Sequence, residues 1–297
     1  MGPRQSPRSS VRKRRKVRFR SVDRQPAVAG TFYPGSAAAV TAEAASLVTG
    51  DAAPAPAIAV VSPHAGWRYS GALAGRLFAG VVVPERVLVI CPNHTGHGPR
   101  ASIWSAGDRG GDAAGSWRLP GLDVPIDAPF VASLLAEAPA LRADRDAHEE
   151  EHAIEVLLPL IAVRQPKLRL AAIVLGGLGF GECEALGAAI ARTVAGADGP
   201  TLIVASSDMS HYLEDAEARA VDKLALAPLA AADPRGLYDA VRTHGISMCG
   251  YIPATVALIA ARALGATRAT VVGYATSADA GADRDRVVGY AAIRIDA

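Results

Sequence analysis

Short apolar runs rich in β-branched residues alternate with longer Ala/Leu-rich stretches along most of the chain. We expect strands at 57–62, 87–91, 168–176, 201–207, 270–277 and 287–295, and helices at 71–80, at 182–194 and through a long region after 207. This alternation is typical of α/β layers. Because several of these strands are apolar without a break, we expect both of their faces to be covered, in a largely parallel or mixed central sheet flanked by helices.

Three further segments carry local predictions. The Gly/Asp-rich residues 107–115 indicate a surface loop, and residues 117–122 predict a hairpin or an irregular excursion. A helix is expected to open at Asp146 and to present an apolar stripe as far as Ile161. No linker is visible after Pro26, so residues 25–297 are predicted to form one domain.

Composition agrees with a globular protein, but the charge is uneven. The 297 residues are 50% hydrophobic and 20% charged, with a net charge of +2. Residues 1–24 hold ten Lys/Arg against one acid, which leaves the rest of the chain net acidic. We expect residues 1–24 to form a disordered basic tail. Contact of this tail with nucleic acid is conceivable but unspecific, so we assign it no function.

Cysteine usage and hydropathy bear on the compartment. The three cysteines stand at 91, 183 and 249 without CxxC spacing, which supports neither a disulfide framework nor a structural zinc site. No apolar run approaches the roughly 18 residues of a membrane span. We therefore expect a cytoplasmic protein that does not enter a membrane.

Histidines follow directly on two of the predicted strands. His64 comes after 57–62 and His94 after 87–91, each with a proline between the strand and the histidine. Ligands of open α/β sheets bind beyond the carboxyl ends of the strands, so both side chains are predicted to enter one crevice. A single histidine in such a place is more often structural, but the repeated design favours a site.

The strand at 201–207 leads into Asp208 and His211. Such a pair can bind a metal or pass a proton, and Asp208 could also orient His211 by accepting its ring N–H. A purely structural cap is the alternative.

Cys249 stands just before a helix whose first turn accommodates Pro253. That position lowers the pKa of a thiol and favours a thiolate, as a nucleophile or a metal ligand, although an inert buried cysteine is the alternative.

The helix expected to begin at Asp146 carries three further candidates. Its apolar stripe is flanked by Glu151, His152 and Glu155. We expect them at the crevice rim as acid/base or supporting groups, or else as an acid-rich first turn that complements the helix dipole.

Seven ordered motifs lie between residues 24 and 293: RQPAVAGTFYPG, SPHAGWRYSG, CPNHTG, HEEEHAIEVLLP, SSDMSHY, MCGYIP and YATSADAGADRDRVVGYAAI. In these motifs the chain resembles the Memo family, whose bacterial members belong to the AmmeMemoRadiSam system and whose fold is similar to that of the class III extradiol dioxygenases. The resemblance implies that His64, His94 and Cys249 are metal ligands, with Asp208 and His211 adjoining. It also implies iron(II) or copper as the metal, and the name of the system suggests association with a radical-SAM protein.

These observations leave the reaction open. Two imidazoles with a thiolate suit Cu(I), Zn or Fe(II), whereas two imidazoles with a carboxylate favour a non-heme iron oxygenase. The leading hypothesis is a dioxygenase-like oxidoreductase acting on an unidentified small molecule or peptide, in which His211, oriented by Asp208, moves protons. The alternative is a non-catalytic protein that binds metal, a peptide or a partner protein in the same crevice. A third hypothesis is hydrolysis with Cys249 as nucleophile and His211 as base.

Overall fold

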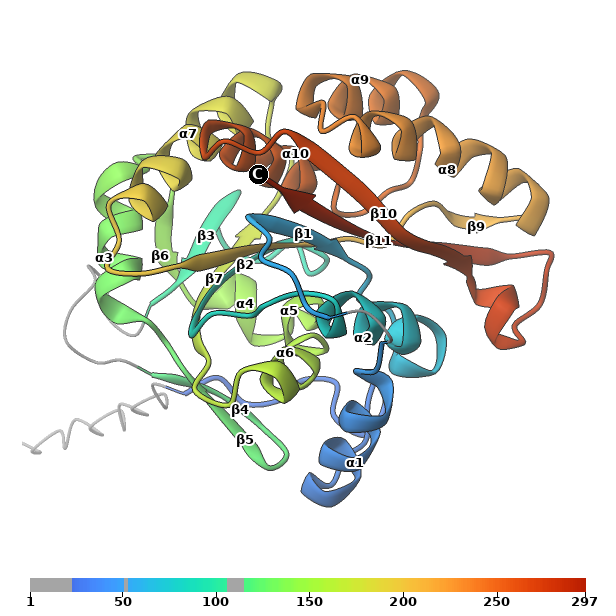
Figure 1. The fold of residues 1–297 in the computed structure, drawn as a ribbon, viewed down its shortest axis with the longest axis horizontal. Coiled ribbons are helices and arrows are strands. Elements are labelled where there is room, and N and C mark those ends of the chain that lie inside the picture. Colours follow the sequence, from blue (N-terminus) through green and yellow to red (C-terminus); the bar gives the residue numbers. More distant parts are fainter. Residues whose placement is uncertain (1–22, 51–52, 106–114) are drawn as a thin grey trace, which may run out of the picture.

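The computed structural model describes residues 23–50, 53–105 and 115–297, with one mixed sheet at its centre (Figure 1). The sheet has the strand order β10-β11-β1-β8-β2-β7-β3-β6, with β9 paired to β11, and β4 and β5 form a separate hairpin. The strands are β1 (Ala59–Ser62), β2 (Arg86–Pro92), β3 (Ala101–Trp104), β4 (Ser116–Leu119), β5 (Leu122–Pro125), β6 (Arg142–Asp144), β7 (Arg169–Leu175), β8 (Thr201–Ser206), β9 (His211–Leu213), β10 (Arg268–Thr276) and β11 (Val287–Asp296). The helices are α1 (Ala37–Leu47), α2 (Ala72–Ala79), α3 (Ala128–Glu137), α4 (Asp146–Glu149), α5 (His152–Glu155), α6 (Leu158–Arg164), α7 (Phe180–Ala195), α8 (Asp215–Ala230), α9 (Pro234–His244) and α10 (Tyr251–Ala263), with a π-helical turn η1 (Trp67–Gly71) and a 3-10 turn η2 (Ser277–Ala280).

Four neighbouring strands form a parallel centre. β1 pairs with β8, β8 with β2 and β2 with β7, all in parallel, whereas β11 and β3 join this centre in antiparallel pairs. Every residue of β1, β2 and β8 is buried, as expected for strands whose middle residues are all apolar and whose two faces are both covered. The expected α/β fold is confirmed, with a sheet that is mixed rather than wholly parallel.

Helices cover both faces of this sheet. Figure 1 shows α7, α8, α9 and α10 on one side and α1, α2, α5 and α6 on the other. α10 packs on β1, β2 and β8, and α5 contacts β2. Because β1, β8 and β2 are neighbours, their carboxyl ends lie side by side, and Ser62 is in register with Ser206. The segments that follow these strands therefore meet at one edge of the sheet.

Several local predictions hold in detail. The hairpin expected at 117–122 is β4–β5, and the helix expected at 182–194 is α7. The long region after 207 contains three successive helices, α8, α9 and α10. None of the helices in the described segments is long and apolar enough to cross a bilayer.

The helix expected from Asp146 is instead three short helices. α4 ends at Glu149, Glu151 has extended backbone (φ −76°, ψ 123°), and α5 begins at His152. α6 then starts at Leu158, with Pro159 in its first turn. The break has a physical reason, because the extended Glu151 directs its carboxylate to the backbone N–H groups of His94 and Ala153.

The predicted end of the tail is also wrong. Arg24 is 1% exposed, pairs with Glu155, and donates to the carbonyl oxygens of His148 and Glu151. Its guanidinium lies 4.4 Å from the centre of the Trp117 ring. A buried charge requires such partners, so Arg24 belongs to the domain. Residues 1–22 of the predicted tail and residues 107–114 of the predicted loop lie outside the described residues.

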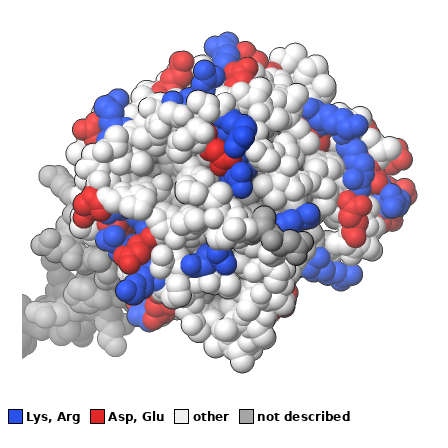
Figure 2. Space-filling model, in the orientation of Figure 1, with Lys and Arg blue, Asp and Glu red and all other residues white. Residues whose placement is uncertain are grey.

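Basic and acidic side chains are interspersed over the face seen in Figure 2. The described residues form several exposed ion pairs, such as Arg192 with Glu137 and Arg235 with Asp239. Among the described residues on that face, no broad patch of one sign appears.

Candidate metal centre

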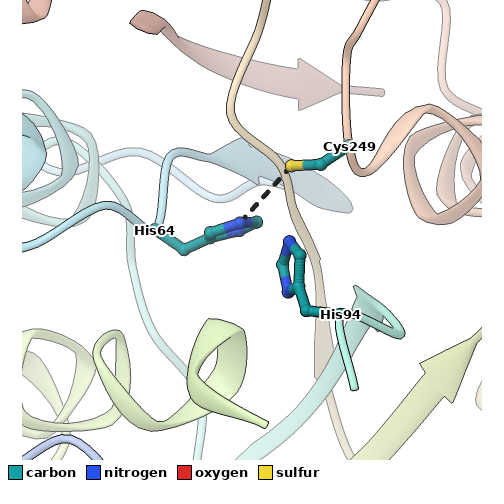
Figure 3. Close-up of side chains that lie close together, drawn as sticks. All are labelled: His64, His94 and Cys249. Atoms are coloured by element: carbon teal, nitrogen blue, oxygen red, sulfur yellow. Dashed lines mark hydrogen bonds between the residues drawn. The ribbon is translucent and has the colours of Figure 1, made fainter. Parts of the chain in front are cut away.

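His64, His94 and Cys249 converge from three separate segments (Figure 3). His64 follows β1, His94 follows β2, and Cys249 precedes α10. Nε2 of His64 lies 3.4 Å from Sγ of Cys249, and one ligand atom from each of the three residues lies within 4.8 Å of the other two. Two ligands of one tetrahedral ion lie about 3.3–3.8 Å apart, so the contact between His64 and Cys249 already has this spacing and the three side chains are close enough to hold a common metal.

The hydrogen bonds of His64 determine which of its ring nitrogens is available. Nδ1 lies 2.7 Å from Oγ of Ser206, and that hydroxyl donates its single hydrogen to the carbonyl oxygen of Ala153 at 2.6 Å. The hydroxyl must therefore accept from Nδ1–H, which leaves the lone pair of Nε2 facing Cys249. Burial, followed by the charges of neighbouring histidines, holds the pKa of His64 well below its usual value. His64 is thus a neutral imidazole, the form that binds metals.

His94 is oriented by a carboxylate. Its Nδ1 donates to Oε1 of Glu151 at 2.8 Å, and its backbone N–H donates to Oε2 at 2.7 Å. Burial acts to raise the pKa of Glu151, but the hydrogen bonds and charge of His94 outweigh it, and the net pKa is lowered. A carboxylate behind a ligating histidine fixes the tautomer and raises the basicity of the other nitrogen. The predicted supporting role of Glu151 therefore has a specific partner.

Cys249 departs from the sequence-based expectation in its acidity. It does stand just before α10, with Gly250 as the capping residue. Burial, and secondly the charge of Asp208, nevertheless raise the pKa of its thiol, where the helix terminus was expected to lower it. Desolvation of the thiolate thus outweighs the helix dipole. A divalent cation bound at the sulfur would reverse this balance, because coordination deprotonates a thiol.

Asp208 and His211 both line the site, but Asp208 is not the partner of the Nδ1–H of His211. That nitrogen donates to the carbonyl oxygen of Ser247 at 2.9 Å, and the backbone N–H of His211 donates to Oγ of Ser247 at 2.8 Å. Asp208 instead accepts from the backbone N–H of His64 at 2.8 Å, and burial raises its pKa to about 6. The orienting residue of His211 is therefore Ser247, and its Nε2 is the nitrogen left available.

His152 and Glu155, the other two residues predicted at the rim, lie in different places. The ring of His152 stacks on that of His94 with their centres 4.6 Å apart, and His152 lines the same pocket. His94, Glu151 and His152 also form a second group whose ligand atoms are close enough to hold a metal. Glu155 is fully buried away from the pocket, where it pairs with Arg24 and accepts from Tyr33 Oη at 2.7 Å. The predicted rim position of Glu155 is wrong because the helical wheel assumed an unbroken helix.

The three candidate ligands, together with His152, Asp208 and His211, line one open pocket of about 460 Å³. Its lining residues are Phe32, His64, Ala65, His94, His152, Asp208, His211, Tyr212, Ser247, Cys249 and Val288. Nitrogen and sulfur donors thus lie in a hollow whose other walls include aromatic and aliphatic side chains, a combination usual for small-molecule sites.

The pattern of apolar strands did not single out Ser206, Ser247 or Tyr212. Ser206 ends β8, so a hydroxyl at a strand end beside Asp208 was an available signal. Ser247 acts on the ring of His211 through a backbone carbonyl, which leaves no trace in the sequence. Tyr212 directly follows His211, and only its backbone conformation distinguishes it.

Comparison with known proteins agrees with these motifs. Residues 24–294 match the family model described as Memo-like protein. The chain is 32% identical over 280 residues to a MEMO1 family protein of Methanothermobacter thermautotrophicus, covering 90% of this chain and 98% of that protein. It is 35% identical over 271 residues to a MEMO1 family protein of Aquifex aeolicus, covering 90% of this chain and 97% of that protein. A MEMO1 family protein of Archaeoglobus fulgidus is 34% identical over 276 residues, covering 91% of this chain and 98% of that protein.

Proposed function

The chain belongs to the Memo family, and we propose that it is a metal-binding oxidoreductase of the extradiol dioxygenase type, with iron(II) or copper held by His64, His94 and Cys249. The observation that carries this proposal is the arrangement of the two imidazoles. Each has its Nδ1–H engaged by a dedicated acceptor, Ser206 or Glu151, and each therefore offers Nε2 as a ligand. A purely structural histidine has no need to keep one nitrogen free in an open pocket.

The donor set agrees with the proposed metals. Two neutral imidazoles and a thiolate suit Cu(I), Zn and Fe(II), and the cytoplasm that we propose as the compartment would keep Cys249 reduced. When bound, the metal would supply Lewis acidity and one-electron chemistry. The pocket leaves room beside the three ligands for a substrate of small-molecule size.

His211 is the residue that we propose moves protons. It lines the pocket, and because Nδ1–H is held by the Ser247 carbonyl, Nε2 is the acceptor for a substrate proton. Asp208 holds the backbone of His64 in place and brings a second titratable group to the same pocket. Cys249 serves in this scheme as a ligand, because its raised pKa and its contact with His64 rather than His211 disfavour a hydrolytic nucleophile.

The test is metal content by mass spectrometry on protein purified without oxygen, for the wild type, His94→Ala and Cys249→Ala. About one iron or copper per chain, lost in both variants, is expected. His97→Ala is the matched control, because His97 lies three residues from His94 but belongs to neither candidate ligand group, and it should retain the metal. Absence of metal from the wild type, even after reconstitution, would overturn the proposal.

Oxygen uptake then separates catalysis from binding. The metal-loaded wild type is expected to consume O₂ with a catechol or another reducing aromatic substrate, and His211→Ala should slow this at unchanged metal content. Tight, saturable metal binding without turnover would instead select a non-catalytic metal-binding or partner-binding protein that uses the same pocket.

A further inference from the structure

Tyr212 has a backbone conformation that its residue type disfavours. Its φ is +64°, in the left-handed region where glycine is usual, and its side chain is 65% exposed. Val287 pairs with Leu213 while Val288 pairs with His211, so Tyr212 is the extra residue of a β-bulge between β9 and β11. Bulges beside active sites redirect side chains, and backbone strain in such places is retained when it has a use.

The bulge brings the Tyr212 side chain into the wall of the metal pocket. Tyr212 lines the pocket next to His211, and the centres of these two rings lie 5.8 Å apart. The guanidinium of Arg286 lies 5.1 Å from the centre of the Tyr212 ring, a cation–π contact that restrains the ring. Phe32 supplies a second aromatic ring to the pocket lining, where it lies 4.8 Å from the ring of His152.

Packing does not account for this arrangement. An exposed tyrosine contributes little to the core, while the left-handed conformation costs an L-residue free energy that glycine would avoid. Aromatic rings interact with one another beyond simple burial, and they present flat faces. A pocket lined by Phe32 and Tyr212 therefore suits a flat ligand better than a puckered one.

We propose that Tyr212 is the specificity-determining residue of the pocket, and that its ring contacts the substrate and selects planar, aromatic molecules over saturated ones of similar size. The inference rests on the proposed function, because it takes the metal pocket to be the substrate site. It adds that β9 and its bulge, outside the metal ligands, decide which molecules enter.

Equilibrium binding without oxygen tests this, with 4-nitrocatechol as the planar probe and cis-1,2-cyclohexanediol as the saturated one. Tyr212→Gly should lower the affinity for 4-nitrocatechol about five- to tenfold, the range expected for the loss of one aromatic contact. The affinity for the diol should not change. Tyr212→Phe should stay within about twofold of the wild type, since the ring is kept. Metal content should be the same in all three proteins.

Thermal unfolding supplies a second readout that a structural role would not give. Tyr212→Gly should raise the melting temperature by about 2–4 °C, because glycine releases the backbone strain. The same substitution should lower the affinity for 4-nitrocatechol. Ala232→Gly is the matched control: Ala232 is the other non-glycine residue with positive φ in the described segments, at +50°, and it lies outside the pocket lining. It should gain stability without any change in binding.

Several outcomes would overturn the inference. These are unchanged affinity of Tyr212→Gly for 4-nitrocatechol, equal losses for both probes, or a lowered melting temperature. If the wild type holds no metal, the proposed function fails on metal analysis alone, and the same two probes are applied to the metal-free protein. Failure of 4-nitrocatechol to bind either form at millimolar concentration would reject the aromatic preference.

Discussion

The ring of His94 donates its Nδ1–H to the buried carboxylate of Glu151 at 2.8 Å, and the same carboxylate accepts the backbone N–H of His94. One side chain thus fixes both the position and the tautomer of a candidate ligand. The location of Glu151 depends in turn on the interruption between α4 and α5, where its backbone is extended. The break in this helix therefore has a direct consequence for the site.

Glu151→Gln should weaken metal binding about 10- to 100-fold, the usual loss when the partner behind a ligating histidine is changed. Glutamine keeps the size of the side chain but loses the charge that raises the basicity of Nε2. Competition with a chromogenic chelator measures the affinity. Glu150→Gln, at the exposed neighbouring position, is the control and should bind as the wild type does. Equal affinities for all three proteins would contradict the role given to Glu151.

Arg24→Ala should destabilise the domain by about 3–5 kcal/mol, because it leaves the buried carboxylate of Glu155 without its cation. Urea unfolding followed by circular dichroism measures the loss. Arg235→Ala removes one partner of an exposed ion pair with Asp239, where water screens the charges, and should cost much less stability than Arg24→Ala. Similar losses in the two variants would argue that Arg24 is not part of the folded domain.

Strands β1, β2, β7 and β8 were predictable because burial on both faces leaves unbroken apolar runs, as in β2 and β8. β3, β6 and β9 have only three or four residues each and carry no such run, and none of them was predicted. The convergence of His64 and His94 was predictable for the same reason as the sheet: parallel neighbouring strands end at one edge.

Roles that depend on side-chain direction were harder to predict. Glu151 and Glu155 are four residues apart and would share a face of one helix, but the break sends them to different partners, His94 and Arg24. The acidity of Cys249 was predicted from the helix terminus alone, and the sequence does not show how deeply the sulfur is desolvated. Burial and hydrogen-bond partners are properties of the folded chain, so a linear pattern specifies them only in part.

The stability of the protein should fall in acid because of His148. Its ring is fully buried, and burial, followed by the charge of Arg24, lowers its pKa to about 3. The unfolded chain takes up this proton near pH 6.5 and the folded one does not, so the stabilisation is complete above pH 6.5 and is lost as the pH falls toward 3. The slope approaches about 1.4 kcal/mol per pH unit inside that window.

Urea unfolding between pH 4 and 7 for the wild type and His148→Gln isolates this contribution. The wild type should lose stability relative to the variant as the pH falls, since glutamine does not titrate. Other titrating groups affect both proteins equally and cancel in the difference. Parallel stability curves would show that His148 takes up its proton in the folded state.

Cys249 should react slowly with iodoacetamide in the metal-free protein at pH 7.5, more slowly than a cysteine in an unstructured peptide. Only the thiolate attacks, and burial together with the charge of Asp208 raises the thiol pKa. Asp208→Asn removes the second of these causes, so it should lower the pKa and speed the alkylation. Mass spectrometry of digested protein assigns the modification, and Cys91 and Cys183, both buried, should remain unmodified. If Cys249 instead reacts as fast as the peptide or faster, its thiol pKa is not raised, and the hydrolytic alternative regains the nucleophile that the raised pKa denies it.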